Sequence, residues 1–79
     1  YPNPFNPDLN IKYEVPLSGL VNLKIYDIRG KLVEEIFEKY QFPGQYNVVW
    51  SAKNISSGIY FIKMQALNQT QTRKVILLK

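Results

Sequence analysis

The sequence of 79 residues contains no histidine and no cysteine. Histidine is the usual general acid or base near neutral pH, and cysteine is a nucleophile and a metal ligand, so both absences argue against catalysis and transition-metal binding. The missing cysteine also excludes disulfides. Glu34 and Glu35 are adjacent carboxylates, but neighbours on a strand point to opposite faces, so we interpret both as solvated charges. The sequence therefore predicts a protein that is not an enzyme and has no cofactor or metal site.

Long apolar runs are absent as well. No stretch approaches the roughly 18 apolar residues that span a bilayer, so we expect no transmembrane segment. Glycine is scarce, and its four copies lie at separate turn positions, which argues against a phosphate-binding loop. The chain does not begin with Met, so we interpret residues 1–79 as one domain excised from a longer precursor.

Acidic residues are absent from the second half of the chain. All six acids lie in residues 1–38 together with four bases, whereas residues 39–79 contain six bases and no acid. A cationic strip of this kind either discourages aggregation of an edge strand or docks on an anionic partner, and the sequence leaves both interpretations open. The bases are too few, and the aromatic residues too regularly spaced for a core, to favour nucleic-acid binding.

Aromatic residues are the main resource for a core. The chain has six Tyr, four Phe and one Trp, each able to bury about 150–250 Å². Trp50 is in phase with Tyr46 and Val48 in a period-two pattern, which favours a place at the centre of the core. The alternative for a lone Trp is a platform on which a sugar stacks.

The first half of the chain predicts a lead-in followed by two strands. Three prolines in residues 1–7 exclude a helix or a central strand, because proline lacks a backbone N–H donor. We interpret this segment as a pinned, extended lead-in, and the alternative is a disordered linker. Apolar and polar residues then alternate over residues 9–15 and 21–26, which predicts two half-buried strands. The short turn from Pro16 to Gly19 predicts that these strands pair as a hairpin.

The middle of the chain is partly ambiguous. After a predicted turn at Gly30, apolar residues at positions 32, 33, 36 and 37 match one face of a helix. Seven residues between turn signals are too few for a stable helix, so we predict a strand over residues 32–38. Pro43 and Gly44 predict a tight turn with positive φ at the glycine, before a strand over residues 46–50. Ile55 is predicted to plug the core from the following loop.

The end of the chain predicts a second hairpin. Residues 59–64 and 72–79 are apolar segments joined by a polar turn over residues 68–71. The first segment has apolar residues on both faces near its start, which is typical of a central strand. In the second, one apolar pair can face the core and the other must be covered or exposed. Six or seven short strands, counting the lead-in, predict an all-β, immunoglobulin-like Greek-key β-sandwich.

Several short motifs occur in the order and spacing of one known family. They are residues 1–7, Val15-Pro16 with Gly19, residues 23–31, Pro43-Gly44 before Tyr46, Trp50, residues 57–61 and residues 74–79. On these motifs the chain resembles the C-terminal sorting domain of the type IX secretion system, an immunoglobulin-like tail of exported bacterial proteins. The resemblance covers the whole chain. It departs at Val75, where methionine is frequent, and at Ile55, where leucine is frequent.

The resemblance implies a non-catalytic C-terminal targeting signal. Such a signal directs an upstream, covalently linked cargo protein through the periplasm and across the outer membrane, for release or for attachment to the cell surface. The implied partners are proteins of the secretion machinery and a sortase at the outer membrane, which cuts off the tail and joins the cargo to lipopolysaccharide. No nucleic acid is implied.

The resemblance also assigns residues. The stretch that the machinery reads corresponds to Lys74, Val75, Ile76, Leu77, Leu78 and Lys79. Gly58 and Tyr60 correspond to a motif at the start of a strand, and with Trp50 they are expected to have structural roles. The alternative, from a different class, is an immunoglobulin-like accessory module of a larger extracellular protein. Such a module would bind carbohydrate, mediate cell adhesion or act like the module of flagellar hook-cap proteins.

Overall fold

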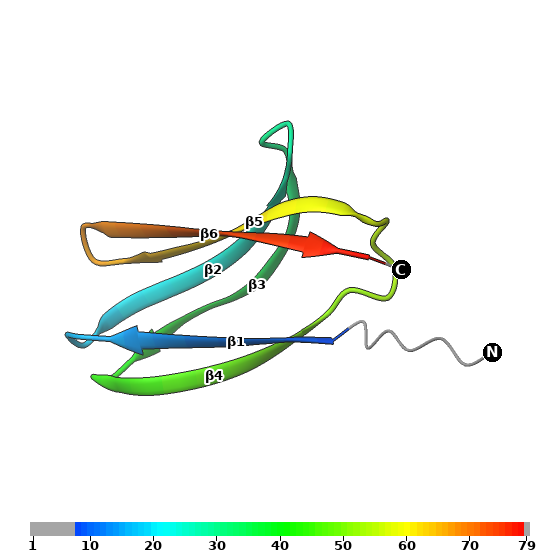
Figure 1. The fold of residues 1–79 in the computed structure, drawn as a ribbon. Helices are drawn as coiled ribbons and strands as arrows, with labels where there is room; N and C mark the ends of the chain where they lie inside the picture. The colour runs from blue at the N-terminus through cyan, green and yellow to red at the C-terminus, as the bar shows by residue number, and fades with distance from the viewer. Residues whose placement is uncertain (1–7, 79) are drawn as a thin grey trace.

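The computed structural model describes residues 8–78, which form six β-strands and no helix (Figure 1). The strands are β1 (Asp8–Val15), β2 (Gly19–Asp27), β3 (Leu32–Gln41), β4 (Gly44–Ser51), β5 (Gly58–Ala66) and β6 (Gln69–Leu77). Every pairing is antiparallel, with β1 and β4 in one sheet and the order β3-β2-β5-β6 in the other. The prediction of an all-β, immunoglobulin-like sandwich is confirmed. The predicted lead-in, residues 1–7, lies outside the described residues.

β1 and β2 do not form the predicted hairpin, because β1 pairs with β4 and β2 pairs with β3 and β5. Val15 lies opposite Gly44 and Gly19 lies opposite Gln41, so the β2–β3 hairpin continues across a corner into the β1–β4 pair. In a hairpin the apolar sides of β1 and β2 would lie on the same face of one sheet. Here the chain passes from one sheet to the other after Val15, so the apolar side of β1 packs against the apolar side of β2 and both are buried.

β3 is a strand, as predicted, and its irregular pairing explains the helix-like spacing of its apolar residues. The register with β2 shifts at two places, which leaves Ile36 and Val33 without an opposite residue in β2. Each extra residue is a β-bulge that turns the preceding part of the strand to the other face. Val33, Ile36 and Phe37 therefore all pack against the core, although they do not alternate.

The core lies between the two sheets. Trp50 is 1% exposed and is the largest fully buried side chain, as the alternation of β4 predicted. Its neighbour Val49 is 57% exposed, so β4 has one buried and one open face. Ile55 packs on the core from the loop after β4, also as predicted, and its N–H donates to the Ala52 carbonyl at 3.1 Å.

The β2–β3 turn is centred on Gly30, as predicted. Gly30 has a φ of 87°, in the left-handed region, and its N–H donates to the Asp27 carbonyl at 3.0 Å. Asp27 Oδ1 accepts hydrogen bonds from the backbone N–H groups of Arg29 and Lys31, each at 2.9 Å. The carboxylate thus holds the turn together.

The terminal hairpin of β5 and β6 is confirmed, but its turn is tighter than the predicted connection over residues 68–71. Ala66 lies opposite Gln69, so only Leu67 and Asn68 form the turn. Two-residue connections are favoured because their backbone twist matches that of the strands. Leu67 adopts a φ of 57°, and its side chain lies against Gly19, where an added Cβ would be 2.8 Å from Leu67 Cδ2. Leu67 thus contacts the start of β2, although its backbone conformation favours glycine.

Candidate functional site

The stretch singled out by the sequence, residues 74–79, comprises the end of β6 together with Leu78 and Lys79. β6 pairs with β5 from Ala66 opposite Gln69 to Gly58 opposite Leu77. Its other edge pairs with no strand within residues 8–78, so β6 is an edge strand of the larger sheet (Figure 1). Lys79 lies outside the described residues. A strand with a free edge offers its backbone N–H and C=O groups to another strand.

Alternation divides the described part of this stretch between two faces. Val75 and Leu77 are half-buried and pack against the core. Ile76 and Leu78 are 60% and 69% exposed, and Lys74 is exposed as well. Val75 and Leu77 therefore anchor the strand to the sandwich, while Lys74, Ile76 and Leu78 are presented to the surroundings.

Gly58 and Tyr60 shape the start of β5, which is the neighbour of the end of β6. The Tyr60 hydroxyl donates to the Ser56 carbonyl at 2.7 Å, four residues upstream. The Tyr60 ring lies over Gly58, where an added Cβ would be 3.6 Å from Tyr60 Cε2. Tyr60 also lies opposite Val75 in the ladder. The tyrosine therefore ties the loop before β5 to the strand that supports the terminal stretch.

The same arrangement occurs at the start of β4, where sequence reasoning did not assign it. The Tyr46 hydroxyl donates to the Phe42 carbonyl at 2.7 Å, and an added Cβ at Gly44 would be 3.7 Å from Tyr46 Cε2. In both places a strand begins with Gly-x-Tyr and the tyrosine bonds to the carbonyl four residues before it. The repeated tripeptide is the sequence signal that could have revealed this device.

Trp50 links the two sheets, because its side chain joins β4 of one sheet to β3 of the other. Its indole Nε1 donates to Glu34 Oε1 at 2.9 Å, and its ring meets the Tyr60 ring edge-on at 6.4 Å between centroids. Glu34 is exposed, but the interpretation of this residue as a solvated charge only is wrong, because it accepts this bond. The bulge at Ile36 turns Glu34 to the face of its partner Ile25, which is the core face, and this change could not be read from a regular alternation.

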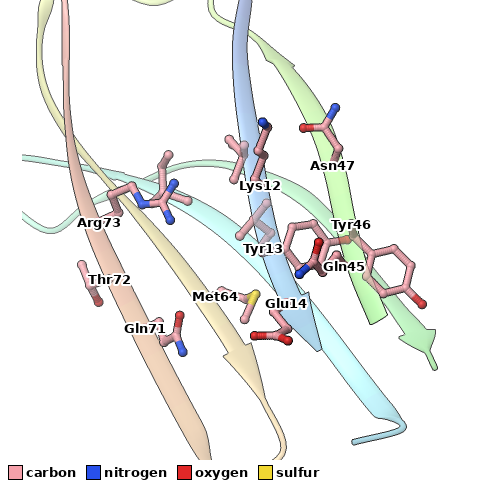
Figure 2. A pocket seen from close by; sticks show the side chains of 13 residues that line it. Lys12, Tyr13, Glu14, Gln45, Tyr46, Asn47, Met64, Gln71, Thr72 and Arg73 are labelled. Carbon is pink, nitrogen blue, oxygen red and sulfur yellow. The ribbon is translucent and has the colours of Figure 1, made fainter. Parts of the chain in front are cut away.

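A groove of about 760 Å³ opens between the sheets on the side of β1 and β6 (Figure 2). Its floor includes the core residues Ile11, Leu23 and Ile62, and its rim carries polar side chains from both strands. In Figure 2 Arg73 extends from β6 toward the middle of the groove. Neither β1 nor β6 has a second paired neighbour among residues 8–78, so both flanks of the groove are free strand edges.

Tyr13 forms the aromatic wall of this groove. Its ring stacks on that of Tyr46 with centroids 5.5 Å apart, and its hydroxyl donates to Gln41 Oε1 at 2.9 Å. Partial burial raises the pKa of the Tyr13 phenol above the ordinary value of 10.0; Tyr46 adds to this rise and the bond to Gln41 opposes it. Tyr13 is therefore neutral at physiological pH and acts as a packing and hydrogen-bonding group.

The described residues place few reactive groups together. In residues 8–78 no three His, Cys, Asp or Glu side chains are grouped so that they could hold a metal ion. The same part of the chain contains no helix that is long and apolar enough to cross a membrane. What the structure does bring together is a free strand edge, an anchored terminal strand and an alternating set of exposed side chains on it.

Of the comparisons with known proteins, the one with protein families gives a match over nearly the whole chain. A family model described as the secretion system C-terminal sorting domain matches residues 1–78. No curated protein and no solved structure matches the chain. The matched range includes all six strands and the described part of the terminal stretch.

Proposed function

Because the chain belongs to the family of C-terminal sorting domains of the type IX secretion system, we propose that the end of β6 is the part of this signal that the machinery reads. The domain is a targeting signal for type IX secretion, a non-catalytic role, and it gives its cargo a secreted or cell-surface fate. The proposal assigns recognition to Lys74, Val75, Ile76, Leu77, Leu78 and Lys79. The rest of the sandwich displays this stretch.

The observation that carries the proposal is the combination of an anchored strand and a free edge. β6 is held by nine residue pairs to β5 and leaves its other edge unpaired within residues 8–78. A partner strand added there would gain backbone hydrogen bonds along the ladder, and the exposed side chains of Ile76 and Leu78 would give specificity. Recognition by backbone and shape suits a signal that must work on different cargo proteins.

The wider route is also part of the proposal. Residues 1–79 act as a single domain joined covalently to an upstream cargo, which reaches the outer membrane through the periplasm. Secretion-machinery proteins bind the folded signal there, and a sortase removes it and joins the cargo to lipopolysaccharide. Gly58, Tyr60 and Trp50 have structural roles in this scheme, supported by the Tyr60 hydroxyl bond at 2.7 Å and the burial of Trp50 at 1% exposure.

The alternative of an accessory carbohydrate-binding, adhesion or hook-cap-like module is not favoured. The family match is to a sorting domain over residues 1–78. Trp50, the side chain on which a sugar would have stacked, is 1% exposed and donates its N–H to Glu34 within the fold. A ring enclosed in this way offers no face to a sugar.

Truncation tests the proposal. A reporter protein carrying this chain at its C-terminus is expressed in a bacterium with a type IX system, with or without residues 75–79. The truncated fusion is expected to accumulate in the periplasm, and the full-length fusion to reach the surface or the medium. Fluorescence of Trp50 in the purified fusions, made with a reporter that lacks tryptophan, checks that the sandwich has formed. Normal export of a folded, truncated fusion would contradict the proposal.

A further inference from the structure

The outer face of the larger sheet, which points away from the core, is not uniform. Its side chains form rows that cross the strands. One row consists of Glu38, Asn22, Gln65 and Thr70, and it is entirely polar. Two rows nearer the end of β6 are apolar over most of their length, namely Leu32, Tyr26, Phe61 and Lys74 in one and Ile59 and Ile76 in the other. The apolar half of this face therefore adjoins the terminal stretch.

We name the apolar half the outer patch, consisting of Tyr26, Phe61, Ile59, Ile76 and Leu32. The first three are half-buried, and Ile76 and Leu32 are 60% and 48% exposed. Phe61 lies opposite Lys74 and Ile59 lies opposite Ile76, so the patch is continuous with the presented side of residues 74–78. No strand of residues 8–78 covers it.

Lysines flank the outer patch on one side and at the end of one row. Lys24 and Lys63 lie opposite each other in the adjacent row, and Lys74 closes the row of Phe61. Lys63 Nζ lies 5.5 Å from the centroid of the Tyr26 ring. Glu35 lies opposite Lys24 and partly offsets its charge, whereas neither Lys63 nor Lys74 lies opposite an acid. The nearby Asp27 accepts bonds from the backbone N–H groups of its own turn.

The patch is also hollowed. A depression of about 430 Å³ lies between Tyr26, Phe61 and Lys63 on the strands and the β2–β3 turn. Aromatic side chains in a depression with charged residues at its rim are typical of the centre of a protein interface. A depression accepts a protruding side chain of a protein partner, whereas a bilayer is met by side chains that protrude from the protein.

From these observations we propose that the outer patch is a second docking surface of the sorting signal, and that its occupant is a secretion-system protein presenting an apolar side chain surrounded by carboxylates. This inference rests on the proposed function, because it extends recognition from the terminal stretch onto the sheet behind it. The partner's carboxylates face Lys63 and Lys74, and its apolar group enters the depression beside Tyr26 and Phe61. Electrostatic complementarity of this kind mainly fixes orientation and accelerates association.

Lys63→Glu is the sharpest test variant. It replaces one member of the like-charged pair Lys24 and Lys63 with an acid, so the folded sheet loses a repulsion and gains an attraction. This gain offsets the loss of the Lys63 contact with the Tyr26 ring, so the fold is expected to keep about its original stability. Phe61→Thr is the second variant, because threonine suits a strand and removes the aromatic ring. Gln65→Glu is the matched control, on the same face of the same strand in the polar half.

Each variant is measured in the reporter fusion for the fraction of cargo that leaves the cell, and in the purified chain for urea unfolding. Lys63→Glu and Phe61→Thr are expected to lower export by about tenfold at unchanged or, for Phe61→Thr, modestly reduced stability. Gln65→Glu is expected to export normally. Normal export of Lys63→Glu and Phe61→Thr, with export still lost on removal of residues 75–79, overturns this inference and leaves the proposed function intact. Normal export of the truncation overturns the proposed function itself.

Vesicle binding distinguishes a lipid surface from a protein partner as the occupant of the outer patch. The chain is mixed with vesicles of equal parts phosphatidylethanolamine and phosphatidylglycerol, and binding is followed by co-sedimentation. The proposal expects no difference between the original chain and Lys63→Glu. Vesicle binding that is lost in Lys63→Glu and Phe61→Thr but kept in Gln65→Glu would assign the patch to an anionic lipid surface and overturn the protein partner.

Discussion

The indole Nε1 of Trp50 donates a hydrogen bond to Glu34 Oε1 at 2.9 Å, and this bond joins a strand of one sheet to a strand of the other. Trp50 is the largest fully buried side chain, so its N–H has no access to water if the partner is removed. The bond exists because the bulge at Ile36 turns Glu34 toward the core face. A single irregularity in β3 thus provides a partner for the centre of the core.

Replacing Glu34 with Ala is expected to lower the free energy of unfolding by about 1–2 kcal/mol, because a buried donor is left without an acceptor. Glu34→Gln keeps an acceptor oxygen and should lose less than half of that amount. Glu35→Ala is the control, since Glu35 lies opposite Lys24 on the outer face and should change stability by about 0.5 kcal/mol or less. Urea unfolding followed by Trp50 fluorescence measures all three. An equal effect of Glu34→Ala and Glu35→Ala would contradict the cross-sheet role.

The tyrosine hydroxyl bonds of the two Gly-x-Tyr segments are expected to contribute similarly to stability. Tyr60→Phe and Tyr46→Phe each remove a hydroxyl bond of 2.7 Å to a backbone carbonyl and are expected to cost about 1 kcal/mol each. Tyr40→Phe serves as the control, because the Tyr40 side chain is 62% exposed. Chemical denaturation of the three variants gives the comparison. A Tyr60→Phe variant as stable as the Tyr40→Phe control would show that the hydrogen bond from Tyr60 to the Ser56 carbonyl contributes nothing to stability.

Ionisation of Tyr13 makes the free energy of unfolding depend on pH in the alkaline range. Burial raises its pKa in the folded chain above the ordinary value of 10.0, so the neutral phenol is favoured by folding. This contribution is fully present below the unfolded pKa and is lost as the pH rises through the folded pKa. Tyr13→Phe cannot ionise and should lose less stability between about pH 8 and about pH 11 than the original chain. Parallel losses in urea unfolding at the two pH values would exclude Tyr13 as a source of the dependence.

Gly30 offers a test of backbone strain alone. Its φ of 87° lies in the left-handed region, and no atom lies within 4 Å of an added Cβ. Gly30→Ala is therefore expected to cost about 1–2 kcal/mol from conformation without any steric contact. Gly30→Asn should cost less, because asparagine tolerates this region better. Thermal unfolding measures both, and an alanine variant as stable as the original would contradict the strain.

Much of the fold was predictable because one side of each strand is buried. Alternation located three of the strands and put Trp50 in the core, apolar segments beside a polar turn located β5 and β6, and Gly30 marked its turn. The partner of β1 was not predictable, since local alternation shows which side is apolar but not which sheet covers it. The bulges at Val33 and Ile36 were hidden for a related reason. They change the phase of a strand, and this only becomes visible once its pairing with β2 is known.

The candidate site divides in the same way. Alternation within residues 75–78 predicted that one apolar pair would face the core and that the other would be either covered or exposed. Ile76 and Leu78 are the second pair, and both are exposed. The outer patch could not be predicted, because Tyr26, Phe61 and Lys74 are far apart in the chain. They form one row only through the registers of β2 with β5 and of β5 with β6.

The central claim, that the presented side of the terminal strand carries the sorting signal, is tested most directly by changing that side alone. The double variant Ile76→Ser with Leu78→Ser is compared with Leu17→Ser and Leu20→Ser, whose side chains are similarly exposed at 62% and 55%. The export of a reporter fusion is measured for both, together with the urea unfolding of the purified chains. Export is expected to fail for Ile76→Ser with Leu78→Ser while its stability stays within about 0.5 kcal/mol of the control. Normal export of this stable double variant would contradict the claim.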